Sequence, residues 1–163
     1  MLTRHLYKYV STRKVKTMGD ETFWQLCLNG ESENVKTAID NGVDVNETDM
    51  ANITGLMWAL RRGHNNVVHL LLHHPEIDVN KIDLDGNSGL HWAVSSDNYE
   101  GLEALLHRQD LTGINKKHYW GQMAIMEAIS CNALNCFHVL LNNLLADLDT
   151  RDNYQRSAEE VIR

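Results

Sequence analysis

Apolar residues along the chain follow the spacing of short amphipathic helices. Leu56, Ala59 and Leu60 stand three and four residues apart, and residues 67–71 carry a second set with similar spacing. Each set places its apolar side chains on one face of a helix, and Gly63 breaks the pattern between the two. Two helices this short cannot bury both faces alone, so we expect copies of the unit to stack.

The unit returns about every 34 residues. An Asp-Val-Asn-like triplet marks each copy, and its last members lie 34, 35 and 34 residues apart, at Asn46, Asn80, Asn115 and Asp149. A small residue follows the first three markers by 13 residues, at Ala59, Ala93 and Ala128. We therefore divide the chain into a basic N-terminal arm, residues 1–19, and a repeat domain, residues 20–163. The units of this domain are about 20–48, 49–82, 83–117 and 118–151, with a partial unit at 152–163.

The unit resembles the ankyrin repeat, whose helix start has the pattern T-P-L-H-x-A. The matching segments read Thr-Gly-Leu-Met-Trp-Ala at 54–59 and Ser-Gly-Leu-His-Trp-Ala at 88–93. The proline of the pattern is replaced by Gly55, Gly89 and Ala124. The resemblance covers roughly residues 20–163 and implies an all-α solenoid of stacked helix-turn-helix units with short hairpin loops.

The resemblance also implies a binding surface for a protein partner. In this family the contacts come from the concave face, at the tips of the hairpin loops and the ends of the first helices. The corresponding residues are Met50, Ile53, Arg61, Arg62, Leu84, Asp85, Asn87, Tyr119, Trp120, Gln122, Tyr154 and Arg156. Large apolar groups recur among them at positions with little core to enter, which favours a binding strip centred on Tyr119 and Trp120. The alternative is that these side chains pack over neighbouring loops.

Three further side chains have expected structural roles. Trp58 and Trp92 share one repeat position and are expected to pack between adjacent units. His91 occupies the histidine position of the family pattern, and the resemblance implies a hydrogen bond that links adjacent loops.

A possible modification site follows from the same resemblance. Asparagines in ankyrin hairpins are substrates of the asparaginyl hydroxylase of the oxygen-sensing pathway. That enzyme favours a Leu eight residues upstream and an acidic residue two upstream, and Leu72 and Asp78 satisfy this around Asn80. The alternative is that Asn80 only bonds turn backbone, as Asn commonly does.

Residues with catalytic or metal-binding chemistry do not assemble into a known motif. His69 and His73 stand four apart, but no Cys or carboxylate completes a zinc site in sequence, so we expect both on the surface. Cys27 and Cys136 fall on apolar positions, while Cys131 falls near a helix end. We predict no cofactor, no metal and no catalytic residues, and an enzymatic or metal-dependent protein is the least favoured alternative.

Charge is distributed unevenly along the 163 residues. The net charge of −7 combines +5 in residues 1–19 with −12 in the remainder. The acidic part disfavours nucleic acid and suits a partner with a basic surface. The basic arm is compatible with a mitochondrial leader, a nuclear-import signal, a segment that folds on the acidic body, or a plain linker.

Cysteine usage and hydropathy bear on location. Three cysteines without a CxxC pair disfavour a disulfide framework and favour an intracellular protein, cytoplasmic or nuclear. We find no secretory signal and no apolar run long enough to span a membrane. The sequence thus predicts a non-catalytic interaction module, an adaptor or inhibitor, with a monomer favoured. The alternative is a fragment of a larger ankyrin scaffold.

Overall fold

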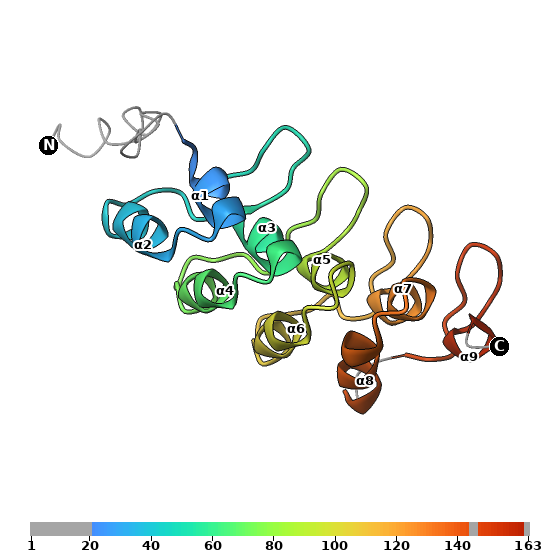
Figure 1. Ribbon diagram of the computed structural model, residues 1–163. Coiled ribbons are helices and arrows are strands. Elements are labelled where there is room, and N and C mark those ends of the chain that lie inside the picture. Colours follow the sequence, from blue (N-terminus) through green and yellow to red (C-terminus); the bar gives the residue numbers. More distant parts are fainter. Residues whose placement is uncertain (1–20, 144–146, 162–163) are drawn as a thin grey trace, which may run out of the picture.

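The chain forms two layers of short helices (Figure 1). The computed structural model describes residues 21–143 and 147–161, and within them it contains nine helices and isolated β-bridges. The basic arm of residues 1–19 lies outside the described residues. No helix in the described ranges is both long and apolar enough to cross a membrane.

The two layers are built from helices that alternate along the chain. The first layer contains α1 (Phe23–Asn29), α3 (Gly55–Arg62), α5 (Gly89–Val94) and α7 (Ala124–Ser130). The second contains α2 (Ser32–Asp40), α4 (Asn65–Leu72), α6 (Tyr99–Leu106) and α8 (Leu134–Asn142). Each helix packs on its equivalent in the next unit, and α9 (Ala158–Val161) continues the first layer beside α7. The all-α solenoid expected from the sequence is confirmed.

Left-handed residues end the first helix of each unit. Gly63 has φ of 70°, and Asp97 and Asn132 take the same role with φ of 51° and 57°. This conformation lets the chain reverse and begin the second helix directly. The start of α3 is capped by Thr54, whose Oγ1 accepts the Met57 N–H at 3.2 Å.

Close packing explains the glycines at two helix starts. A Cβ atom on Gly55 would lie 2.7 Å from Sγ of Cys27, on the preceding unit. A Cβ on Gly89 would lie 3.1 Å from Leu105 and 3.2 Å from Leu60. A larger residue at either position would require the neighbouring side chains to move, because interiors are close-packed.

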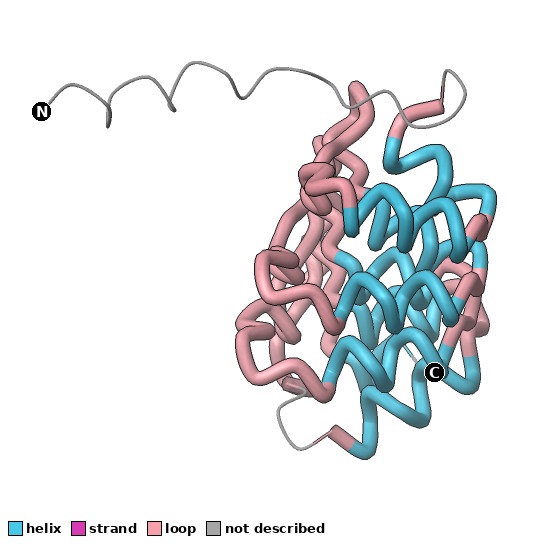
Figure 2. Tube along the Cα trace, turned by 90° about the vertical axis from the view of Figure 1, so that its left-hand side faces the viewer, coloured by secondary structure: helices cyan, strands magenta, loops and turns pink. Residues whose placement is uncertain are grey.

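The hairpin loops gather along one side of the helical layers (Figure 2). Neighbouring tips are joined by backbone bonds, from Leu84 N–H to Ala51 O at 3.0 Å and from Tyr119 N–H to Asp85 O at 2.9 Å. The tips therefore form one continuous row. We call the surface between this row and the first-layer helices the concave face.

The repeated asparagines join the bases of adjacent loops. Nδ2 of Asn80 donates to Asp110 O at 2.7 Å, and its Oδ1 accepts the Thr112 N–H at 2.8 Å. Asn46 makes the equivalent pair of bonds to the next loop. Asn80 therefore bonds loop backbone, while its hydroxylation stays a prediction.

Candidate protein-interaction surface

One side chain at a fixed repeat position organises each loop tip. In the third unit, Oδ1 of Asp83 accepts the backbone N–H groups of Asp85 at 2.9 Å and Asn87 at 2.8 Å. Its Oδ2 accepts Nδ2 of Asn87 at 2.9 Å and Nε1 of Trp92 at 3.0 Å. Asp83 is buried, and these four bonds satisfy its carboxylate. The tip is thus tied to α5.

The second unit repeats this arrangement. Oδ1 of Asp49 accepts the N–H groups of Ala51 at 2.8 Å and Ile53 at 2.9 Å, and its Oδ2 accepts Nε1 of Trp58 at 3.2 Å. In the partial fifth unit, Asp152 serves as the anchor, with the guanidinium of Arg156 at 2.8 Å in place of an indole. Three tips therefore share a carboxylate anchor.

The fourth unit uses different chemistry at both positions. His118 replaces the anchoring carboxylate, and its Nδ1 accepts the Trp120 N–H at 3.0 Å. Burial lowers the pKa of His118, so the ring is held neutral and keeps its acceptor. Glu127 stands at the repeat position of Trp58 and Trp92.

The tips carry a row of exposed apolar side chains. Met50 is 100% exposed, and Tyr119 and Trp120 are each 70% exposed, with Leu84 and Tyr154 exposed as well. Such a row on rigid backbone is the kind of surface that partners bury. These five residues lie where the sequence predicted, although their role in binding stays a prediction.

Ile53 is the exception, because its side chain is only 8% exposed. The expectation that this side chain is exposed is wrong. Asn52 directly before it has φ of 66°, and the Ile53 N–H bonds to Asp49. The Ile53 side chain is buried, and it lines a pocket on the concave face.

The remaining predicted residues divide by exposure. The charged side chains Arg61, Arg62, Asp85 and Arg156 are exposed. Asn87 and Gln122 are half-buried, with Asn87 held by Asp83 and Nε2 of Gln122 donating to Ser130 Oγ at 3.2 Å.

Two indoles in tilted contact line the concave face behind the tips. The ring centroids of Trp58 and Trp92 lie 5.4 Å apart, which confirms packing between adjacent units. The Arg61 guanidinium lies 5.2 Å from the centroid of Trp92, and its Nη1 donates to Ser95 Oγ at 3.4 Å. Both indoles are half-buried, so one side of the row remains open to the surface.

His91 joins the third unit to the fourth. Its Nδ1 accepts the Ser88 backbone N–H at 3.2 Å, so the ring proton sits on Nε2, which donates to Gln122 O at 3.2 Å. Burial lowers the pKa of His91 to about 4, which keeps it neutral at pH 7. The expected structural hydrogen bond between loops is confirmed.

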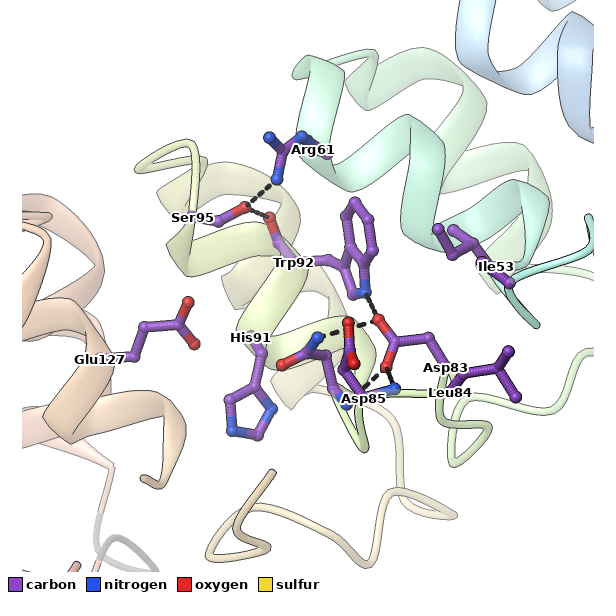
Figure 3. A pocket seen from close by; sticks show the side chains of 11 residues that line it. Ile53, Arg61, Asp83, Leu84, Asp85, His91, Trp92, Ser95 and Glu127 are labelled. Carbon is purple, nitrogen blue, oxygen red and sulfur yellow. Dashed lines mark hydrogen bonds between the residues drawn. The ribbon is translucent and has the colours of Figure 1, made fainter. Parts of the chain in front are cut away.

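A pocket of about 280 Å³ lies on the concave face, lined by side chains of the second and third units and by Glu127 of the fourth (Figure 3). Its lining includes Arg61, Asp83, Leu84, Trp92 and Glu127. Glu127 points from α7 toward α5, and its Oε2 is buried without a hydrogen-bond partner. Burial raises the pKa of Glu127 to about 7. Sequence reasoning missed Glu127, although its alignment with Trp58 and Trp92 was a usable signal.

Histidine and cysteine side chains are scattered rather than clustered. His69 and His73 are exposed on α4, as expected, and no group of three or more His, Cys, Asp or Glu in the described ranges could hold a metal ion. Cys27 and Cys136 are buried and Cys131 is exposed. Burial raises the pKa of the Cys136 thiol to about 12, the opposite of nucleophile activation.

Comparisons with known proteins agree with this arrangement. No curated protein matches the chain. Residues 23–116 match the family described as ankyrin repeats in three copies, which spans more than half of the chain and includes the Asp83 anchor and both indoles. The chain belongs to the ankyrin-repeat family.

Proposed function

We propose that the chain is a non-catalytic interaction module, an adaptor or an inhibitor, that binds a protein partner through its loop tips and concave face. The observation that carries the proposal is the row of exposed apolar side chains at Met50, Leu84, Tyr119, Trp120 and Tyr154. Adjacent tips are hydrogen-bonded to each other and anchored by buried side chains, so little order has to be gained on binding.

Charge and cysteine chemistry support the finer features of this proposal. The −12 charge beyond the arm favours a partner with a basic surface and disfavours nucleic acid on the body. Free thiols at Cys27, Cys131 and Cys136 suit a reducing compartment, so we place the protein in the cytoplasm or nucleus. A monomer suffices for binding through this surface.

The decisive experiment compares removal of the aromatic pair at the centre of the strip with removal of an exposed tyrosine elsewhere. Tyr119→Ala combined with Trp120→Ala removes the centre of the strip, whereas Tyr99→Ala removes an exposed tyrosine from α6 in the outer layer. With a partner identified by affinity capture, the first variant should weaken binding at least tenfold, about 1.4 kcal/mol, by isothermal titration calorimetry. The second should bind normally.

Circular dichroism and the melting temperature show whether the variants remain folded. A folded Tyr119→Ala/Trp120→Ala protein with unchanged affinity would overturn the proposed strip. Measuring the affinity at several salt concentrations separates the electrostatic contribution of the acidic body from the apolar contribution of the tips. Salt screens charges, so it weakens the first contribution far more than the second.

A further inference from the structure

The pocket on the concave face has Glu127 at a repeat position that carries tryptophan in the two preceding units. Trp58 and Trp92 pack against each other in a tilted arrangement, and the next side chain in this row is Glu127. Glu127 therefore brings a carboxylate to the wall of the pocket where the preceding units have an indole. The open side of Trp92 and the Leu84 side chain form its apolar walls.

The pocket carries more negative than positive charge. Asp83, Asp85 and Glu127 line it, against the single guanidinium of Arg61. Arg61 lies over Trp92 and bonds Ser95, so it does not satisfy Oε2 of Glu127. Asp83 has four donors, which leaves Glu127 as the carboxylate with a buried, unpartnered oxygen. An unpartnered carboxylate on the wall of the pocket favours a ligand that brings a donor.

We propose that this pocket binds a lysine or arginine side chain of the protein partner, with the charged head at Glu127 and the aliphatic stem against Leu84 and Trp92. The inference rests on the proposed function, since it names the chemistry of one partner residue at the concave face. Asp85, exposed at the rim, adds attraction for the approaching cation.

Other occupants fit the lining less well. An anionic group would face three carboxylates. An apolar side chain would cover Glu127 without supplying a donor, which leaves the buried oxygen unpaired. A cationic side chain matches both the apolar wall and the carboxylate of Glu127, because its methylene stem is apolar and its charged head donates hydrogen bonds.

Small probes test the pocket without a partner. We would titrate Nα-acetyl-lysine methylamide into the full chain at pH 8 and low salt, and record the Trp92 indole N–H and Glu127 side-chain NMR signals. The norleucine analogue lacks only the ammonium group. We expect millimolar, saturable shifts at both residues with the lysine probe, and at least tenfold weaker binding of norleucine.

Substitutions then locate the cation. Glu127→Gln keeps the size of the side chain and should weaken the lysine probe at least tenfold, while Glu103→Gln, an exposed change on α6, should leave it unchanged. Glu127→Trp should remove the carboxylate and abolish binding. Equal binding of lysine and norleucine probes, or no effect of Glu127→Gln, would overturn the proposal.

The pKa of Glu127 gives an independent readout. Arg61, Asp83 and Cys131 interact electrostatically with it, Asp85 and His91 line the same pocket, and His118 lies next to His91. A bound cation favours the ionised carboxylate, so the lysine probe should lower this pKa in an NMR titration, and norleucine should not.

The lysine probe also tests whether the cation comes from the partner or from the basic arm of the same chain. The chain has its own basic residues at Arg4, Lys8, Arg13, Lys14 and Lys16. If the lysine probe binds only after these five are replaced by Gln, the arm occupies the pocket and assignment to a partner is overturned. The probe experiment needs no partner. If the lysine probe does not bind, the pocket proposal is wrong, but the proposed binding strip at Tyr119 and Trp120 is unaffected. If the Tyr119→Ala/Trp120→Ala variant binds its partner normally, the strip is wrong, but the result with the probe still holds.

Discussion

The second and third units differ from the fourth at two positions that work together. Asp83 and Trp92 are bonded to each other, as are Asp49 and Trp58, so each of these tips is tied to its own first helix. His118 occupies the anchor position of the fourth unit, with Glu127 at the helix position. At that helix position the indole is replaced by a carboxylate with an unpartnered oxygen, and this carboxylate lies on the wall of the pocket.

The two kinds of anchor hold their loop tips differently. A carboxylate anchor is ionised at neutral pH and accepts several amides at once, whereas a neutral imidazole offers a single acceptor. The fourth tip, which displays Trp120, is therefore held by fewer bonds than the third. The second and third units have the more firmly anchored tips, and the fourth unit contributes the titratable side chain of Glu127.

Removing a carboxylate anchor should have the largest effect. Asp83→Ala leaves the Trp92 indole and the amides of Asp85 and Asn87 without their acceptor. We expect the free energy of unfolding to fall by about 4 kcal/mol in urea titrations, because several bonds to one buried charge are lost. The neighbouring change Asp85→Ala removes an exposed carboxylate and should cost less than about 0.5 kcal/mol. Similar losses in both variants would contradict the anchoring role.

Spacing was enough to predict the helices and their order. The repeat of about 34 residues placed Gly63, Asp97 and Asn132 at the ends of first helices, and each has the left-handed backbone expected. It also predicted that Trp58 and Trp92 meet, because residues at equal repeat positions stack in a solenoid.

Side-chain direction within the loops could not be predicted in the same way. Ile53 looks like the exposed Met50 in sequence, but it follows the left-handed residue Asn52 and its side chain is buried on the wall of the pocket. The pocket is formed by side chains of three units together, so no single residue in the sequence predicts it. Comparison of the units at the positions of His118 and Glu127 would have shown the change, but not the pocket.

His91 of the third unit and Glu127 of the fourth should give the protein two opposing pH dependences. The pKa of His91 falls from 6.5 to about 4 on folding, so the unfolded chain takes up the proton first. Stability from His91 is therefore complete above pH 6.5 and is lost toward pH 4, by about 3 kcal/mol in total. The pKa of Glu127 rises from 4.5 to about 7, so the native state takes up the proton first, and acid stabilises it.

Glu127→Gln should separate these effects. In the unsubstituted protein, protonation of Glu127 offsets the loss from His91, whereas the variant should lose about 3 kcal/mol between pH 6.5 and pH 4. His118, whose pKa is also lowered by burial, acts in the same direction as His91. Urea unfolding at intervals of half a pH unit measures how the free energy of unfolding of each protein changes with pH. Parallel curves for the two proteins would rule out this role for Glu127.

The smallest effect tests whether positions 118 and 127 form a pair. His118→Asp alone brings a new carboxylate to the site of Glu127, and Glu127→Trp alone places an indole N–H where no carboxylate anchors the tip. Together they restore the arrangement seen for Asp83 with Trp92 and for Asp49 with Trp58. We expect a coupling of about 1.5 kcal/mol in a double-mutant cycle at pH 7.5, since a charged hydrogen bond forms and a repulsion disappears. If the changes in the free energy of unfolding of the two single variants add to within about 0.3 kcal/mol, positions 118 and 127 act independently.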